Sequence, residues 1–182
     1  MKQTVIAFGL IALLFAVAAQ AQAPAPKPGP EHKKLEIWVG DWTAEGENKA
    51  TPLGPAGKLS GKSSVRKVLG GFFVEFRSEF SGPSGTGQIY EIDGYDSSNK
   101  RYTWNNFSSD GSVHVVTYTI EADTVTYSGT ITLGDKQYKT RGTIVFAADL
   151  NSMVEKDELS VDSKTWMPWG EFRFIKAKSS PK

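Results

Sequence analysis

Ten short segments in which polar and apolar residues alternate fill the chain after residue 40, and brief turn sequences separate them. Alternation with a period of two predicts β-strands that are buried on one face and solvated on the other. The connections are short and carry Gly, Asp, Asn or Ser, so they suit antiparallel hairpins and leave no room for crossover helices. The predicted strands are Trp42–Asn48, Lys58–Leu69, Phe72–Phe80, Gly87–Tyr95, Arg101–Phe107, Ser112–Ile120, Thr124–Leu133, Gln137–Ala147, Met153–Val161 and Trp169–Lys176.

A meander of about ten strands has two unpaired edges unless the sheet closes on itself, and closure removes both of them. The sequence therefore predicts an all-β fold, a closed antiparallel meander barrel of about ten strands. A barrel of eight to ten strands is wide enough to hold a small ligand as well as packed side chains.

The first 21 residues have the pattern of a secretory signal peptide. Lys2 provides the positive start, and the apolar run Val5–Ala19 has the length of a signal peptide but is short for a membrane span. Small residues at Ala19 and Ala21 favour cleavage after Ala21. We expect an exported protein, periplasmic or extracellular, that has no membrane contact after cleavage; an uncleaved membrane anchor is the alternative.

Composition divides the remaining chain into a single domain with short ends. Residues 22–30 are rich in Pro and Ala and are predicted to form a flexible leader. Residues 31–178 are predicted to form one barrel domain and residues 179–182 a disordered tail. The chain has no cysteine, and its 21 Lys and Arg nearly balance its 20 Asp and Glu. Stability must therefore come from a buried core, and no basic stripe indicates a nucleic-acid partner.

A short amphipathic helix is predicted between Pro30 and Gly40, directly before the first strand. Pro30 suits the first position of a helix, and Gly40 can end it in a left-handed conformation. Leu35, Trp38 and Val39 share one face at helical spacing. We expect this helix to plug the bottom of the barrel.

The sequence Gly40-Asp41-Trp42 after this helix resembles the Gly-x-Trp of the calycin group, which includes lipocalins and fatty-acid-binding proteins. In those barrels a basic residue on the last strand packs against the tryptophan, and the resemblance places Arg173 in that role. A guanidinium over an indole contributes about 0.5–2 kcal/mol of cation–π attraction. The resemblance thus implies a structural latch made of Gly40, Trp42 and Arg173.

More specifically, the chain resembles a bacterial extracytoplasmic family of unknown function that is similar to nitrobindin-like barrels. The resemblance implies the fold and no established chemistry. Nitrobindin-like barrels hold haem through a histidine late in the chain, and this sequence has no histidine after His114, so haem is not expected. The matching motifs are Glu31-His32 through Trp42, Leu69-Gly70-Gly71-Phe72, Gly94-Tyr95-Asp96 with Tyr102, and the end of the chain from Trp166.

Aromatic side chains on successive strands are the candidates for a ligand site in the lumen. An apolar or aromatic molecule would pack against them, while Tyr hydroxyls and an Asn amide fix its orientation. A core filled by the same side chains is the alternative. The lumen candidates are Phe76, Tyr102, Trp104, Asn106, Tyr127, Tyr138 and Phe146.

Catalytic and metal sites have less support in the sequence, and no catalytic residue, metal or cofactor is expected. There is no cysteine and no Gly-x-Ser-x-Gly motif, so His114 is read as a residue of the barrel wall. Calcium at Asp93 and Asp96 is the weaker alternative, because Asp and Asn are also ordinary hairpin-turn residues. Glu155 and Asp157 share one strand face; facing inward they would have raised pKa values, but we expect a partly exposed strand near the rim.

The predicted function is an exported β-barrel that binds a small apolar or aromatic molecule in its lumen without catalysis. One alternative is an enzyme that acts on a small substrate in the same lumen through Tyr and carboxylate groups. The other is a structural or interaction barrel with a filled core. The sequence leaves the oligomeric state open.

Overall fold

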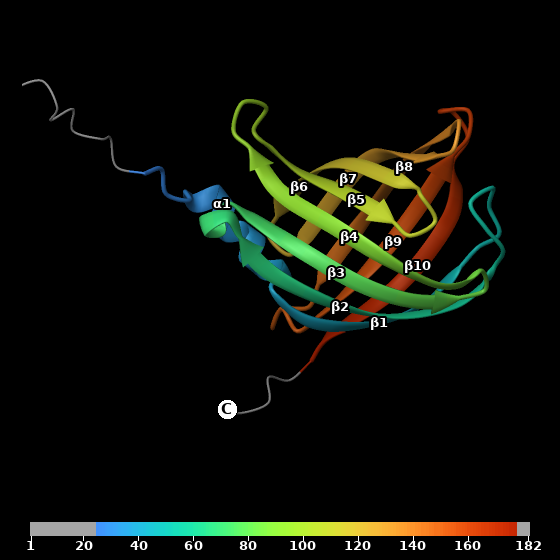
Figure 1. The fold of residues 1–182 in the computed structure, drawn as a ribbon, viewed down its shortest axis with the longest axis horizontal. Coiled ribbons are helices and arrows are strands. Elements are labelled where there is room, and N and C mark those ends of the chain that lie inside the picture. The colour runs from blue at the N-terminus through green and yellow to red at the C-terminus, as the bar shows by residue number, and fades with distance from the viewer. Residues whose placement is uncertain (1–24, 178–182) are drawn as a thin grey trace, which may run out of the picture.

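The computed structural model describes residues 25–177 and shows a closed barrel of ten antiparallel strands (Figure 1). Each strand pairs with its neighbours along the chain, and β1 pairs with β10 to close the ring. The predicted fold is therefore confirmed, and every strand lies within two residues of its predicted bounds. The strands are β1 Gly40–Asn48, β2 Gly57–Val68, β3 Phe73–Gly82, β4 Gly85–Asp96, β5 Arg101–Ser108, β6 Val113–Glu121, β7 Thr124–Leu133, β8 Lys136–Phe146, β9 Ser152–Ser160 and β10 Met167–Lys176.

Some predictions concern residues that the structure does not describe. The signal peptide, residues 1–21, and the tail, residues 179–182, lie outside the described residues, as does the start of the leader. Residues 25–29 of the leader form neither helix nor strand. No helix within residues 25–177 has the length and apolar character needed to cross a membrane.

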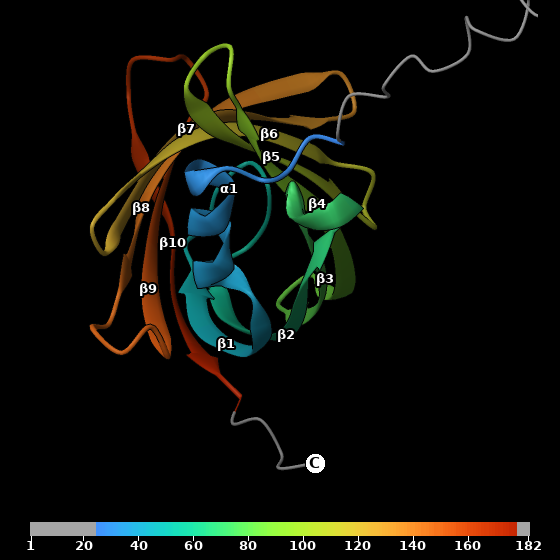
Figure 2. The same ribbon diagram turned by 90° about the vertical axis from the view of Figure 1, so that its left-hand side faces the viewer.

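A helical segment lies across one end of the barrel (Figure 2). It consists of α1, Pro30–Lys34, and the 3₁₀ turn η1, Leu35–Trp38. Leu35 and Trp38 are its buried residues, as their helical spacing predicted. Burial of these two side chains holds the segment in place as a plug.

The plug helix lies between Pro30 and Gly40 as predicted, but Gly40 does not end it in a left-handed conformation. The helix ends at Trp38, and Val39 is already extended. Gly40 is instead the first residue of β1, with φ at 145°. A Cβ atom at Gly40 would lie 3.0 Å from Cε of Lys176, so the close approach of Lys176 and the positive φ both favour glycine here.

Trp42 joins the plug to the barrel wall. It is 3% exposed, and its indole N–H donates a hydrogen bond of 2.7 Å to the carbonyl oxygen of Trp38. Phe146 packs against both indoles, with ring centroids 5.1 Å from Trp38 and 6.4 Å from Trp42. The plug, the first strand and β8 therefore share one aromatic cluster.

The cation over Trp42 is Lys176, which corrects the latch implied by the resemblance. Lys176 Nζ lies 4.7 Å from the centroid of the indole ring. Trp42 and Lys176 are opposite each other in the β1–β10 pair, whereas Arg173 is opposite Glu45. Because alternate residues of a strand face opposite sides, a residue three places before Lys176 points away from the lumen. Arg173 is exposed on the outer face.

The Lys176→Met variant is expected to lower the free energy of unfolding by about 0.5–1 kcal/mol, since it removes a cation–π contact but keeps most of the stem. Arg173→Met is the matched control and should change it by less than about 0.5 kcal/mol. Urea unfolding followed by fluorescence measures both values. A larger loss for Arg173→Met than for Lys176→Met would contradict this assignment.

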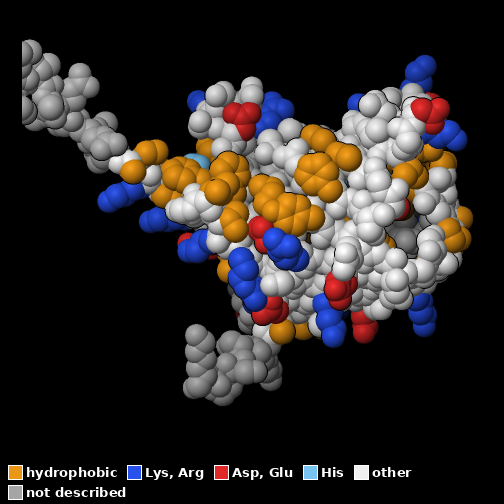
Figure 3. Space-filling view, viewed as in Figure 1, with side chains coloured by type: hydrophobic (Ala, Val, Ile, Leu, Met, Phe, Trp, Pro, Cys, Tyr) orange, Lys and Arg blue, Asp and Glu red, His pale blue; other side chains and the backbone are white. Residues whose placement is uncertain are grey.

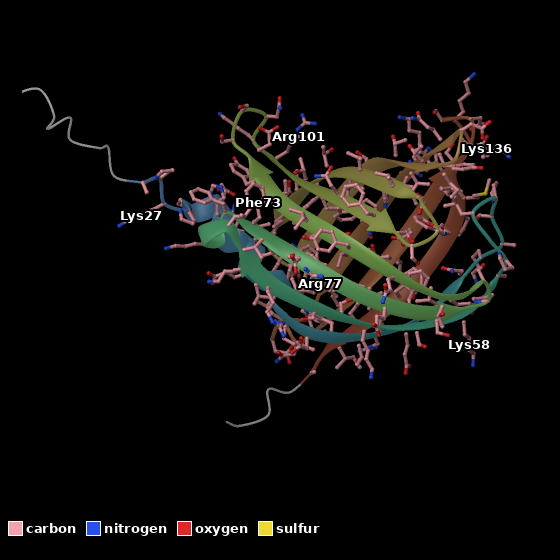
Figure 4. All side chains as sticks on the ribbon, in the orientation of Figure 1. Lys27, Lys58, Phe73, Arg77, Arg101 and Lys136 are labelled. Atoms are coloured by element: carbon pink, nitrogen blue, oxygen red, sulfur yellow. The ribbon has the colours of Figure 1, made fainter. Side chains whose placement is uncertain are left out.

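The connections between strands divide the barrel into a plugged end and an open end. The β1–β2, β3–β4, β5–β6, β7–β8 and β9–β10 connections lie away from α1 (Figure 1). Charged side chains of both signs are interspersed on the outer surface (Figure 3), and Lys58, Arg77 and Lys136 project from it (Figure 4). The open end is therefore the route from solvent to the interior.

Candidate ligand-binding site

The barrel contains a cavity of about 390 Å³ that reaches from Trp38 to the connections of the open end. Its mouth is lined by residues of the β1–β2, β3–β4 and β5–β6 connections, among them Leu53, Pro83 and Asp110. Ligand pockets in proteins have volumes of about 300–1,000 Å³. The interior is thus large enough for a small molecule.

Small inward-facing side chains leave room in the interior. Ala44 on β1 is directly opposite Gly61 on β2, Ser78 faces inward on β3, and all three line the cavity. The opposite wall carries Trp104 on β5 and Tyr127 on β7, whose ring centroids are 4.7 Å apart. Small residues facing large aromatic ones leave a space bounded by a flat apolar surface.

A first pair of carboxyl groups that line the cavity, the β4 acid pair, consists of the half-buried Glu91 and the buried Asp93. Glu91 accepts a hydrogen bond of 3.0 Å from the Asn106 amide, and Asp93 accepts one of 2.8 Å from the Tyr118 hydroxyl. Burial raises the pKa of both carboxyl groups. The charge of Glu91 raises the pKa of Asp93 further, so Asp93 is the group of this pair that keeps its proton to higher pH.

A second pair, the β9 acid pair, consists of Glu155 and Asp157. The hydroxyl of Tyr127 donates a hydrogen bond to Asp157. Burial raises the pKa of Asp157 to about 7. Burial raises the pKa of Glu155 well above its ordinary value, and the charges of Asp157 and Glu91 add to the effect. We expected a partly exposed strand near the rim; instead both side chains face the cavity, where Asp157 is buried and Glu155 is half-buried.

The two acid pairs come from opposite sides of the barrel. In a ring of ten strands, β4 and β9 are separated by four strands in either direction. The effect of Glu91 on the pKa of Glu155 shows that the pairs influence each other across the lumen. Lys49 is the single Lys or Arg among the described residues that line the cavity, and its ammonium lies at the mouth, 3.2 Å from Glu47.

His114 also lines the cavity, on the same wall as Trp104. Its Nε2 lies 2.7 Å from the hydroxyl of Thr140, and burial lowers the pKa of its imidazole to about 4. The ring is therefore neutral at pH 7 and does not compensate the charge of the acid pairs. This position agrees with its prediction as a wall residue.

Four of the seven lumen candidates line the cavity: Phe76, Trp104, Asn106 and Tyr127. They lie at inward-facing positions on β3, β5 and β7, and the structure brings Trp104 and Tyr127 into contact. The side-chain amide of Asn106 donates a hydrogen bond to Glu91. It is therefore already bonded to a carboxyl group of the barrel.

The other three candidates are buried away from the cavity. The hydroxyl of Tyr102 donates to the Glu31 side chain at 2.6 Å, so this residue fastens the plug. Phe146 belongs to the aromatic cluster around the plug. Tyr138 packs in a smaller cluster with Ile131 and Leu159. The alternating pattern of their strands correctly predicted that all three side chains are buried. They lie outside the cavity because they are at other levels along the barrel axis.

Asp93 and Asp96, the calcium alternative, do not share a site. Asp93 faces the lumen, whereas Asp96 accepts hydrogen bonds from the backbone N–H groups of Ser98 and Asn99, at 2.9 and 3.2 Å. Asp96 thus stabilises the β4–β5 turn, as ordinary turn chemistry predicts. Within residues 25–177 no group of three or more His, Cys, Asp or Glu side chains is arranged to hold a metal ion.

The inward position of the β4 acid pair was not predicted from the sequence, because the pattern of β4 favours the opposite face as the buried one. Its opposite face carries Tyr90 and Ile92, which are more apolar than Glu91 and Asp93. The pairing of Glu91 with Phe76 places the acids inside. The alternation of β3 combined with its register against β4 is the signal that identifies them.

These features define a closed ten-stranded barrel with an apolar, acid-containing cavity. The family described as "Protein of unknown function (DUF1579)" matches residues 27–178. The chain belongs to this family. No protein with curated annotation matches the sequence.

Two solved structures share the fold at low sequence identity. Rv2717c from M. tuberculosis has a TM-score of 0.59 and 9% identity, and the match covers 82% of this chain and 99% of that one. The S-type phycobiliprotein lyase CPES from Guillardia theta has a TM-score of 0.54 and 13% identity, with 82% and 94% covered. At these identities the likeness shows the fold alone.

Proposed function

We propose that this protein binds a small, mostly apolar or aromatic molecule inside its barrel. The observation that carries the proposal is the cavity of about 390 Å³ with an aromatic wall at one side and small residues at the other. The likeness to a phycobiliprotein lyase is consistent with a small molecule held in such a barrel. The fold resemblance to calycin barrels, on which the sequence prediction rested, supports the same reading.

Filling the cavity tests this proposal. Ala44→Phe adds an aromatic ring to the lumen and is expected to weaken binding of the neutral probe N-phenyl-1-naphthylamine by about tenfold or more. The matched control is Thr43→Phe, because Thr43 is the adjacent residue and is exposed on the outer face. Fluorescence titration gives both affinities. Equal weakening by both substitutions, or no binding by the wild-type protein, would contradict the proposal.

A second candidate is an enzyme that transfers protons to or from the same bound molecule. It is favoured by Asp157, whose pKa of about 7 suits a general acid or base near neutral pH. Turnover in a screen of small aromatic substrates, lost in Asp157→Asn, would favour this candidate over a binding protein.

We also propose that the protein works outside the cytoplasm, in the periplasm or beyond it. The support is the signal-like sequence of residues 1–21. N-terminal sequencing of protein from cell fractions tests it: a mature chain that begins at Gln22 in an extracytoplasmic fraction is the expected result. An intact N-terminus on cytoplasmic protein would overturn the proposal.

A further inference from the structure

Among the described residues, four carboxyl groups line the lumen below its mouth, and the one lining cation, Lys49, lies at the mouth. Carboxylates buried in proteins are ordinarily paired with a cation or a metal, because the loss of hydration is costly. Here the hydrogen-bond donors that reach the acid pairs are neutral: the amide of Asn106 and the hydroxyls of Tyr118 and Tyr127. The one lining ammonium, Lys49, lies beside Glu47 at the mouth.

A second observation concerns polar atoms that have no partner among the described residues. Asp93 Oδ1 and the indole Nε1 of Trp104 are both buried without a hydrogen bond. Asp93 is 1% exposed and Trp104 is 7% exposed, and both line the cavity. Buried polar groups in native proteins nearly always have a partner. These two atoms line the cavity, where a bound molecule can offer a donor to Asp93 and an acceptor to Trp104.

We propose that the ligand carries a protonated nitrogen, as in a small arylalkylamine or an aromatic amidine, and that this nitrogen binds between the β4 and β9 acid pairs. The inference rests on the proposed function, because it specifies the chemical class of molecule held in the same cavity.

The geometry of the barrel suits such a cation. The acid pairs lie on opposite strands, so an N–H group in the lumen has carboxyl oxygens on both sides. Hydrogen bonds between a charged donor and a carboxylate are about twice as strong as neutral ones. The aromatic body of the ligand then lies against Trp104 and Tyr127, whose rings also attract a positive charge.

The same arrangement disfavours other ligands of equal size. A neutral molecule fills the apolar part of the cavity but leaves the acid pairs without a counter-charge. An anion brings a negative group close to the carboxylates of the acid pairs, and like charges in a buried site repel strongly. Selectivity for a cation over its neutral isostere is therefore the property that the acid pairs add to a general apolar cavity.

A matched series of probes tests this inference: 1-naphthylmethylamine, 1-naphthalenemethanol and 1-naphthoic acid, which share one ring system and differ in charge. Isothermal titration of the full mature protein near pH 7.5 is expected to show the amine binding about tenfold or more tighter than the alcohol, and the acid binding more weakly than both. Equal affinity for amine and alcohol would overturn the inference but leave the proposed function intact. Absence of binding by all three would contradict both.

Two double variants test whether the acid pairs cause the preference for the amine over the alcohol. Glu91→Gln/Glu155→Gln removes one acid from each pair and is expected to reduce the affinity for the amine to about the affinity for the alcohol measured on the same variant. Glu45→Gln/Glu171→Gln is the matched control on the outer face of β1 and β10, where both residues are exposed, and should keep the full preference. If the first double variant does not fold, the single variant Asp157→Asn serves in its place. An unchanged preference in these lumen variants would overturn the inference.

Discussion

The Trp42→Ala variant is expected to lower the free energy of unfolding by about 3–5 kcal/mol, as for other large buried aromatic residues. Trp42 is 3% exposed and joins the plug to the barrel through the carbonyl of Trp38, the ring of Phe146 and the ammonium of Lys176. Its removal leaves a cavity at the place where three elements meet. Guanidinium unfolding followed by circular dichroism measures the loss.

Trp166→Ala is the matched control for this prediction. Trp166 is only partly buried, lies outside the strands, and carries Arg141 4.2 Å above its ring. The same chemical change there should cost about 1 kcal/mol or less, because little core packing is lost. A loss at Trp42 no larger than the loss at Trp166 would show that the plug does not depend on this indole.

The Glu155→Gln variant is expected to stabilise the ligand-free protein by about 1–3 kcal/mol at pH 9, because a neutral amide replaces a carboxylate buried beside other acids. Burial and the charges of Asp157 and Glu91 raise the pKa of Glu155. The folded state therefore binds more protons than the unfolded state above the ordinary carboxyl pKa, and stability falls as pH rises. At pH 4 both states are largely protonated, so the stabilisation should nearly vanish.

Thermal unfolding of the wild-type protein and the variant between pH 4 and pH 9 tests this sign. The wild-type protein should lose stability as pH rises through the pKa of Asp157, about 7, and the variant should lose less. Glu121→Gln, at an exposed position on β6, is the control and should follow the wild-type curve. Stabilisation by Glu155→Gln that is larger at pH 4 than at pH 9 would contradict the assignment of Glu155 as a buried acid.

The stabilising effect has a functional meaning. Groups that bind ligands often lower the stability of the free protein, and their replacement then raises stability at the expense of binding. If the acid pairs hold a cation, the variant with higher stability at pH 9 should also be the one that loses the preference for 1-naphthylmethylamine. A structural role for the same carboxyl groups would produce lower stability.

Much of the fold follows from local sequence patterns. The alternation in Thr124–Leu133 places Val125, Tyr127 and Ile131 on one face, and the structure buries all three. Short turns with Gly and Asp allow only antiparallel neighbours, and a ten-strand meander without edges must close. Strand bounds, topology and the buried faces of Leu35 and Trp38 were therefore predictable without tertiary information.

The site was predictable only in part, because it depends on register and on height along the barrel. Phe76, Trp104, Asn106 and Tyr127 were found from their inward alternation and line the cavity, whereas Tyr102 does not, although its strand pattern is the same. No local pattern distinguishes an inward residue at the plug from one halfway along the strand.

Tertiary structure alone decided two features: the inward position of the β4 acid pair and the contact of Lys176 with Trp42. On β4 the more apolar face, with Tyr90 and Ile92, is the outer one. Pairing with β3 and closure of the ring place the side chains of Glu91 and Asp93 inside the barrel, although carboxyl groups favour water. The β1–β10 register likewise brings Lys176 over Trp42. An alternating sequence predicts that the two faces of a strand differ, but the hydrogen-bonded ring of strands determines which face lies inside the barrel.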